Sequence, residues 1–567
     1  MSRFAETQNT VDVVIVGGGP VGLLLTYQLA RFGCRVSIIE QDDKTQSSYG
    51  RASTMWPRTI ELLDQLDLAE PLIQAGMITR SGLHFHEGRR VKGGLMYGNR
   101  MDKLGDTFFK FALHLRQRLT EEIFADAASK EIGSTHMMLH RMQGFTIDQN
   151  EDSHPVTVQI KDLNTEEVVD IKCKYLIGAD ASTLFGGKST VRKLANISFE
   201  GEHTQGRWIR MDARVTTDMP NPRCLNSIDS ASHGQILWCP IDNGLTRIGY
   251  VFSGSLIEKY GGVEGVTQEV AMVEAKQALH PFKLEFLSVD WFTIYGIGQR
   301  IAGTFCANDR VFLAGDAGHT HSSGSAQGLN TGIHDAVNLA WKLALRVRGL
   351  AKKALLDSYD AERRQVVQTV IDNDKVISTL ISGHYPPRFQ GRSEPTRELL
   401  TEWFNDLNMQ HFTLGLGISY PLSLLNVTIA DPLGTGDPLR LQKILSNRAK
   451  FSIVVFFGNT EYTGLALVDL RTTITALDSF VNVFPAQIFQ WFTIPATFGN
   501  GGQEILGCHP FGKVYLDTEM KAHEMYGVDI RRGAVIVFRP DGWIGTVVPL
   551  SGVGQLNHYF DAILNRR

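Results

Sequence analysis

The N-terminal segment constrains the fold most, because it places a strand, a glycine turn and a helix in a fixed order. Residues 11–16 read VDVVIV, an apolar β-branched run of strand length, and a helical pattern follows the turn. Gly17, Gly19 and Gly22 form GxGxxG, where glycine permits a tight turn and close backbone approach to a pyrophosphate. The next strand ends at Glu40, 23 residues after Gly17, and its carboxylate can accept a ribose hydrogen bond. This pattern predicts a dinucleotide-binding βαβ unit, and the acidic residue favours FAD or NAD over NADP.

Composition excludes several other classes of protein. The chain has 567 residues, 43% of them hydrophobic and 20% charged, which is typical of a globular protein of about three domains. Its 56 basic and 60 acidic side chains nearly balance, which argues against nucleic acid as a partner. No two of the six cysteines form a CxxC pair, so we expect neither a metal site nor disulfides. The polar N-terminus and the lack of a long uncharged apolar run predict a cytoplasmic protein without a membrane span.

A second motif begins at Arg310 and extends to Leu345. It reads RVFLAGDAGHTH, then a glycine-rich turn and a long helical pattern. This segment resembles the GD motif of FAD-dependent aromatic hydroxylases. The resemblance implies that Asp316 hydrogen-bonds the ribityl chain of FAD, and that a turn at the helix start presents N–H groups to the flavin pyrimidine ring. Such donors suit a reduced flavin, which carries negative charge there. The turn residues are Gln327, Gly328, Leu329 and Asn330.

Other segments resemble the same family. Residues 175–193 resemble its DG motif, which lies near FAD and the nicotinamide nucleotide and places Asp180 there. The resemblance also implies that Gln117 touches the flavin and that Arg51 meets the pyrophosphate. Trp291–Ile301 resembles the tyrosine-bearing strand of the phenol 2-monooxygenase branch, with Tyr295 at the tyrosine. Val514–Gly545 resembles the C-terminal thioredoxin-like domain of that branch.

We therefore expect an α/β protein with a Rossmann-like FAD-binding domain, a β-rich substrate domain and a C-terminal thioredoxin-like domain. Residues 1–195 form the first part of the FAD-binding domain, with an excursion into the substrate domain near 80–112. Residues 196–300 form the β-rich substrate domain. Residues 301–425 complete the FAD-binding domain and add helices, and residues 430–567 form the thioredoxin-like domain, which lacks a CxxC.

The resemblance implies a monooxygenase. In that family NADPH or NADH reduces FAD, reduced flavin traps dioxygen as a C4a-hydroperoxide, and a phenolic ring attacks the distal oxygen. Tyr295 then contacts substrate or flavin. Phenol hydroxylases carry an aspartate base where this chain has Ser53 at the substrate site, and serine does not ionise near neutral pH. We therefore expect acidic phenols to be better substrates than plain phenol. His84, His86 and His114 are candidate bases by residue type alone.

Two other functions stay open at this stage. The flavin C4a-hydroperoxide can also serve a Baeyer–Villiger, epoxidising or ring-remodelling oxygenase that acts on a larger aromatic or polyketide-like substrate. The missing aspartate favours this hypothesis. A flavin-binding assembly subunit without oxygenase chemistry is the alternative of another class. Cys508 alone cannot run dithiol exchange, so the C-terminal domain is expected to support assembly of a homodimer.

Overall fold

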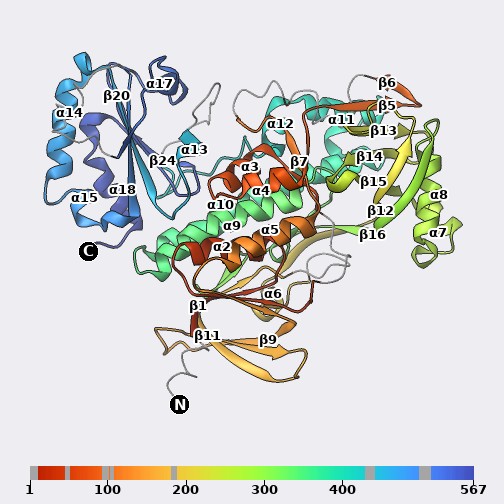
Figure 1. Cartoon of the computed structure of the whole chain (residues 1–567), viewed down its shortest axis with the longest axis horizontal. Coiled ribbons are helices and arrows are strands. Elements are labelled where there is room, and N and C mark those ends of the chain that lie inside the picture. The colour runs from red at the N-terminus through yellow and green to blue at the C-terminus, as the bar shows by residue number, and fades with distance from the viewer. Residues whose placement is uncertain are drawn as a thin grey trace.

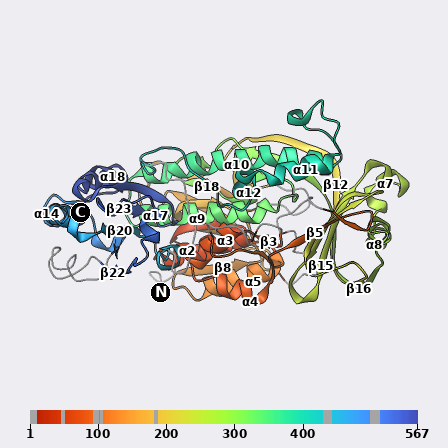
Figure 2. The same cartoon turned by 90° about the horizontal axis from the view of Figure 1, so that it is seen from above.

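The computed structural model describes residues 10–44, 52–91, 101, 107–180, 188–427, 441–496 and 512–567. Figures 1 and 2 show an elongated molecule with a β-rich body at one end and a C-terminal α/β domain at the other. The long helices α9 (Gln327–Val347) and α10 (Lys353–Ile381) run between them. Within the described ranges no helix is long and apolar enough to cross a membrane.

The first sheet is built around the βαβ unit that the sequence predicts. β1 (Thr10–Val16) pairs in parallel with β2 (Val36–Glu40) and with β11 (Val168–Gly178). Helix α2 (Pro20–Arg31) connects β1 to β2 and packs against α9 and α5 (Gln117–Ser129). The core of β1 is fully buried, which explains its uninterrupted run of apolar residues.

The sheet order is β17-β18-β11-β1-β2-β8, and β10 and β9 extend from β11 as an antiparallel pair. The remaining strands of this sheet are β8 (Ser134–Met138), β9 (His140–Ile147), β10 (Val156–Asp162), β17 (Cys306–Ala307) and β18 (Val311–Leu313).

A second sheet of eight strands, mostly antiparallel, forms the β-rich body, in the order β19-β16-β12-β15-β14-β13-β5-β6. Its strands are β5 (Gly82–His86), β6 (Arg89–Val91), β12 (Phe199–Thr217), β13 (Leu225–Ser230), β14 (Gly234–Pro240), β15 (Thr246–Phe252), β16 (Leu284–Ala302) and β19 (His319–Thr320). Helices α7 (Gly254–Lys259) and α8 (Gln268–Ala278) accompany it. β5 comes from the segment near residue 80 and pairs in parallel with β13, so the excursion joins this sheet.

Short elements connect these two bodies. A three-stranded sheet contains β3 (Thr54–Met55), β4 (Met77–Thr79) and β7 (Ala112–His114). Helices α3 (Pro57–Asp64) and α4 (Ala69–Ala75) lie between β3 and β4 in the chain, and α11 (Thr396–Asn405) packs against α10 and α12 (Leu407–Thr413). Helix α6 (Thr190–Leu194) instead packs against β11 and β9 of the first sheet. Trp56 packs with Trp208 and the apolar side of α10 and α11, so a shared core joins the two bodies.

The C-terminal domain has the thioredoxin-like arrangement. Its sheet order is β22-β21-β20-β23-β24, with β20 parallel to β21 and antiparallel to β23. The strands are β20 (Phe451–Gly458), β21 (Phe489–Pro495), β22 (Lys513–Val514), β23 (Ala534–Phe538) and β24 (Ile544–Val548). The helices are α13 (Leu441–Ile444), α14 (Thr460–Thr475), α15 (Phe480–Val483), α17 (Lys521–Met525) and α18 (Gln555–Ile563). Cys508 lies outside the described residues.

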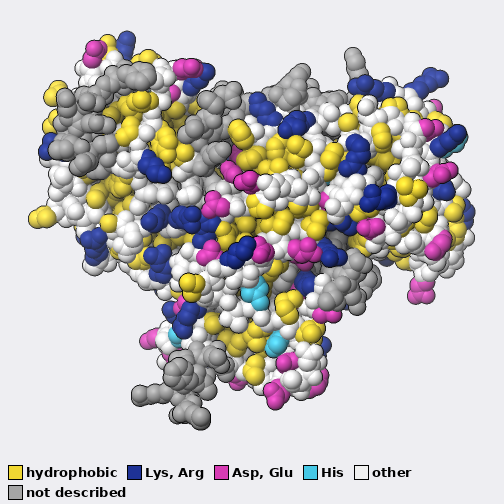
Figure 3. Space-filling model, viewed as in Figure 1, with side chains coloured by type: hydrophobic (Ala, Val, Ile, Leu, Met, Phe, Trp, Pro, Cys, Tyr) yellow, Lys and Arg dark blue, Asp and Glu magenta, His cyan; other side chains and the backbone are white. Residues whose placement is uncertain are grey.

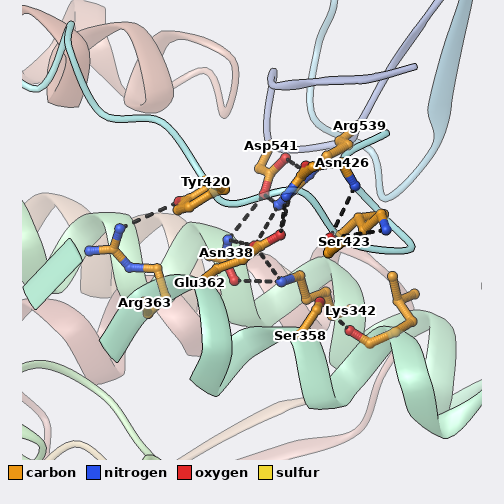
Figure 4. A network of polar contacts seen from close by, with 12 residues as sticks. Asn338, Lys342, Ser358, Glu362, Arg363, Tyr420, Ser423, Asn426, Arg539 and Asp541 are labelled. Carbon is orange, nitrogen blue, oxygen red and sulfur yellow. Dashed lines mark hydrogen bonds and ion pairs between the residues drawn. The ribbon is translucent and has the colours of Figure 1, made fainter. Parts of the chain in front are cut away.

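A buried ionic network attaches this domain to α9 and α10. The Glu362 carboxylate on α10 accepts hydrogen bonds from the Arg539 guanidinium at 2.6 and 2.9 Å and from Lys342 Nζ at 2.8 Å. Asp541 accepts from Arg539 and from the Trp341 indole. Figure 4 shows Glu362 between Lys342 and Arg539. All four charged side chains are almost completely buried. The network therefore fixes the turn between β23 and β24 to α9 and α10.

The surface in Figure 3 carries basic and acidic side chains interspersed across the face in view, with yellow apolar groups between them. This mixture matches the near balance of charge in the sequence.

Candidate active site

One cavity of about 490 Å³ connects the end of β1 to the β-rich body. One side is formed by the glycine turn, the end of β2, and residues from α5 and the end of β11. The other side, here called the sheet wall, is formed by residues of the second sheet. The sheet wall consists of Trp208, Arg210, Leu225, Asn226, Ser227, Gln235, Leu237, Cys239, Arg247, Gly249, Tyr295, Gly296 and Gly298. The loop from Thr320 to Ala326 and the start of α9 close the space between the two sides.

The glycine turn has the geometry that close approach of a ligand requires. Gly17 has φ +108°, a conformation that favours glycine, and a Cβ there would lie 2.5 Å from the Ala179 carbonyl oxygen. A Cβ on Gly19 would meet no atom within 4 Å, so this position opens into the cavity. Glu40 lies beside the turn, where its Oε2 accepts a hydrogen bond from the Gly18 N–H at 2.7 Å. Its carboxylate also lines the cavity, as a ribose-binding acid must.

Three further predicted FAD residues line the same cavity. Gln117 donates to Glu121 at 2.9 Å, and burial raises the pKa of that glutamate. Asp180 accepts from the Ser189 hydroxyl at 2.6 Å and from the Thr190 N–H at 2.5 Å. Asp316 lies in the 3₁₀ turn η4 (Gly315–Ala317), exposed to the cavity.

The start of α9 also faces the cavity, through Gly328 and Leu329. Ala326 precedes the helix with φ 55°, and no side chain in the described ranges caps its first N–H groups. These donors are therefore available to a ligand. The geometry matches the flavin-facing turn that the motif implies.

The other predicted FAD residues pack or hydrogen-bond within the protein, and one of them lies outside the described residues. Gly22 is required by packing, because a Cβ there would lie 1.9 Å from the Gly17 carbonyl oxygen. Asn330 is outside the lining: its Oδ1 accepts from the Trp56 N–H at 2.9 Å and its Nδ2 donates to the Thr54 carbonyl at 2.9 Å. Gln327 donates to the Thr413 carbonyl at 2.8 Å. Arg51 lies outside the described residues.

Two buried aspartates bind the loop between β18 and α9, residues 314–326, here called the GD loop. Neither aspartate was predicted from the sequence. Asp335 on α9 accepts from the Gly315 N–H at 3.0 Å and binds His319 Nε2 at 2.7 Å. Burial by itself would raise the pKa of Asp335, but Arg363 and His319 lower it to about 2. Asp374 on α10 accepts from the Ser322 N–H at 2.8 Å. A proline at position 322 could not make that bond, because it has no N–H. The sequence contained one signal for these residues, namely an acidic residue at a position where the helical pattern predicts an apolar one.

Tyr295 and Ser53, the residues predicted at the substrate site, both line the cavity. The Tyr295 hydroxyl hydrogen-bonds the Ser323 hydroxyl of the GD loop, and both line the cavity. Ser53 also lines the cavity and is buried. His84, His86 and His114 are absent from the described lining. Burial lowers the pKa of His114 to about 3, so it stays neutral between Thr54 and Thr79.

These residues fit an FAD molecule. The open Gly19 position, the Glu40 carboxylate, the exposed Asp316 and the uncapped start of α9 all belong to a single cavity. Their chemistry matches, in that order, a pyrophosphate, a ribose, a ribityl chain and a polar flavin edge.

Comparison with known families agrees with this geometry. Residues 10–374 match the FAD binding domain model, and residues 432–567 match the model described as phenol hydroxylase, C-terminal dimerisation domain. The chain belongs to the family of FAD-dependent aromatic hydroxylases. It is an FAD-dependent monooxygenase of the phenol 2-monooxygenase-like branch.

Relatives of this monooxygenase match it along nearly its whole length. A phenol 2-monooxygenase of Aspergillus fumigatus is 26% identical, over 99% of this chain and 97% of the relative. A 3-hydroxybenzoate 4-monooxygenase of Comamonas testosteroni is 26% identical, over 98% and 95%. The solved structure of the flavin-dependent monooxygenase PieE, in complex with FAD and substrate, superposes with a TM-score of 0.71 at 19% identity and 98% coverage of both chains. The fold is therefore shared.

The predicted role of Asp316 can be tested by flavin binding. Replacing Asp316 with alanine removes a charged hydrogen-bond acceptor, and such bonds contribute about 1.5–3 kcal/mol. We expect the Kd for FAD to rise by roughly 10–100-fold, measured by titrating the apoprotein with FAD. The control is Asp372→Ala, an exposed aspartate of α10 outside the cavity lining, which should leave the Kd unchanged. An unchanged Kd for Asp316→Ala would separate this residue from the flavin.

Proposed function

We propose that this monooxygenase uses NADPH or NADH to hydroxylate a phenolic or polyphenolic aromatic compound. The observation that supports the proposal is the continuity of the cavity, which joins the FAD-type glycine turn to a sheet wall bearing Tyr295. We further propose that FAD is held by Gly17, Gly19, Glu40, Gln117 and Asp316, and by the N–H groups at the start of α9.

Bound FAD, once reduced by the nicotinamide nucleotide, would activate dioxygen and supply one oxygen atom to the ring. The protein's own groups would orient the reactants. The linked hydroxyls of Tyr295 and Ser323 would hold a ring oxygen beside the GD loop, and the buried walls would exclude water. The nicotinamide nucleotide would bind transiently near Asp180, because the sequence has one GxGxxG in the right context.

The test is turnover of the FAD-loaded protein with a panel of phenols. Oxidation of NADPH and NADH, product mass and hydrogen peroxide are measured together. A product heavier by one oxygen with an intact ring and a new hydroxyl supports the proposal. Lactone, epoxide or ring-rearranged products would instead support the alternative of a Baeyer–Villiger, epoxidising or ring-remodelling oxygenase on a larger aromatic substrate. Nucleotide oxidation that yields only peroxide with every compound would contradict hydroxylation of these phenols.

Tyr295 should control how efficiently oxygen reaches the product. Tyr295→Phe removes the hydroxyl that bonds Ser323, so the ring is held less well and intercepts the oxidant less often. We expect product per NADPH consumed to fall several-fold, hydrogen peroxide to rise correspondingly, and FAD content to stay the same. Tyr385→Phe is the matched control, because Tyr385 is exposed and binds only the Glu394 carbonyl among the described residues. Equal coupling across several phenols would remove Tyr295 from the mechanism.

We also propose that the C-terminal domain forms a homodimer contact through α14. Leu465 is 85% exposed on this helix, Val468 lies one turn further along, and Leu477 is 92% exposed just beyond it. Large exposed apolar groups mark interaction surfaces. Leu465→Glu should therefore convert a dimer into a monomer in sedimentation velocity at micromolar concentration, with FAD content unchanged. Val263→Glu, at an exposed apolar position of the β-rich body, is the control. A Leu465→Glu dimer as stable as the wild type would place the contact elsewhere.

A further inference from the structure

Arg210 is a charged side chain buried within the sheet wall. Along β12 the side chains alternate: Ile209 and Met211 enter the apolar core on one face, and Trp208 and Arg210 line the cavity on the other. Only 4% of the Arg210 surface is exposed. A guanidinium in such a place is unusual, because burying a charge is costly unless an opposite charge compensates it.

No carboxylate in the described ranges pairs with Arg210. Its Nη1 donates to the Ile209 carbonyl at 3.0 Å, and its Nη2 donates to the Ser323 hydroxyl at 3.0 Å. Asp212, two residues further along β12, is already bound by both ends of the Arg247 guanidinium, at 2.7 and 2.8 Å. Among the described residues, the two buried guanidinium groups of the sheet wall therefore have one adjacent carboxylate, Asp212, which lies behind the lining.

The remaining groups near Arg210 do not supply the missing negative charge. Burial raises the pKa of the Cys239 thiol to about 12, so this group is neutral at neutral pH. The Ser323 hydroxyl accepts from Arg210 Nη2 and carries no charge. Arginine stays protonated in proteins, so within the described ranges the positive charge of Arg210 has no carboxylate partner of its own.

The neighbouring strand is shaped to accept this guanidinium. Gly249 on β15 lies directly across from Arg210 in the strand register. A Cβ at position 249 would lie 2.1 Å from Nη1 and 2.6 Å from Cδ of Arg210. Any side chain there would displace the guanidinium. Gly249 therefore lets Arg210 lie flat across the sheet while it faces the cavity.

We propose that Arg210 is an anion subsite of the cavity, and that the aromatic substrate bears an ionised oxygen, either a ring phenolate or a ring carboxylate, that pairs with it. This inference rests on the proposed function, because it assigns the substrate class of the same site. It also explains how the substrate could be ionised although Ser53 stands where the family has an aspartate base. A nearby positive charge favours the ionised form of an acidic phenol without a base. The Ser323 hydroxyl joins Arg210 to Tyr295, so the bound anion lies beside the tyrosine.

The experiment measures binding to the oxidised, FAD-loaded protein, without turnover. Hydroxybenzoates with the hydroxyl at the 2, 3 or 4 position are compared with the corresponding hydroxybenzamides, which match them in size but carry no charge. Perturbation of the flavin absorbance reports the Kd. We expect at least one hydroxybenzoate to bind about 30-fold or more tightly than its amide in the wild type, since buried charged pairs are strong.

A second arm titrates a nitrophenol, whose visible phenolate band reports how much of the bound ligand is ionised.

Variants test whether Arg210 causes the preference for anionic ligands. Arg210→Met should abolish both the hydroxybenzoate preference and the enrichment of bound nitrophenolate, and Arg210→Lys should retain part of each. Gly249→Ala keeps the charge but displaces it, so the preference should fall there too. Arg214→Met is the control, because Arg214 lies on the same face of β12, is exposed, and lies outside the cavity lining. FAD content, measured in each variant, shows that the fold is intact.

The two arms separate the two sources of the anion. Preference for hydroxybenzoates assigns a carboxylate, enrichment of nitrophenolate assigns a phenolate, and either supports the subsite. Equal binding of charged and neutral probes in the wild type, no saturable binding of any probe, or an unchanged preference in Arg210→Met would overturn it. A protein that shows the anion preference but forms no hydroxylated product would contradict the proposed function and leave the subsite standing.

Discussion

Glu362→Ala should destabilise the protein by about 3–5 kcal/mol, because it leaves buried positive charges without their main partner. In the native protein the Glu362 carboxylate bonds Arg539, Lys342, Asn338 and Asn426 at distances from 2.6 to 2.9 Å. After truncation, Arg539 keeps its ion pair with Asp541, whereas Lys342 keeps only its hydrogen bond to the Asn338 side-chain oxygen among the described residues. Burial already lowers the pKa of Lys342 to about 8, although Glu362 raises it. Loss of Glu362 therefore favours release of that proton, which limits the cost without removing it.

Urea unfolding of the apoprotein, followed by tryptophan fluorescence, measures this effect directly, since Trp341 lies in the network. The matched control is Asp357→Ala on the same helix, which removes an exposed ion pair with Lys353 and should change the free energy of unfolding by less than about 1 kcal/mol. A loss for Glu362→Ala no larger than that of the control would mean that the network does not hold the C-terminal domain to α9 and α10.

The second large effect is expected at the glycine turn, where two glycines serve different purposes. Gly22→Ala places a Cβ 1.9 Å from the Gly17 carbonyl oxygen, and neither atom can move without its own backbone. Either the turn or α2 must move, and overpacking of this kind costs about 1–3 kcal/mol. We expect lower stability of the apoprotein and loss of FAD together, because the same turn would hold the pyrophosphate.

Gly19→Ala separates the two effects. Its Cβ meets no atom within 4 Å, so the apoprotein should lose less than about 1 kcal/mol of stability. The Kd for FAD should nevertheless rise by at least about 100-fold, because the methyl group would occupy the space that the pyrophosphate needs. Calorimetric titration of both apoproteins with FAD, beside their urea curves, checks the pair. Wild-type affinity in Gly19→Ala would show that the phosphate does not pass over this residue.

Features determined by near neighbours in the chain could be predicted from the sequence. The strand, the glycine turn, the helix and Glu40 lie within one short segment, and local chain geometry dictates how such a unit folds. The GD motif behaves similarly, since Asp316 and the start of α9 are separated by one loop. Both pieces were expected to line a nucleotide site, and both line the cavity. The thioredoxin-like C-terminal domain was expected from a family resemblance, whereas its strand order came from the structure.

The tertiary structure decided everything that depends on which strands and helices meet. Arg210 has Gly249 beside it because β12 and β15 pair in one particular register, and a shift of one residue would turn its side chain into the apolar core. The partners of Glu362 are equally remote, since Arg539 lies 177 residues away along the chain. A single sequence contains Arg210 and Asp212 as alternating charges in an apolar strand, but it does not say that one is paired and the other is not. Burial of a charge becomes informative only when its neighbours are known, and packing, which brings distant segments together, supplies those neighbours.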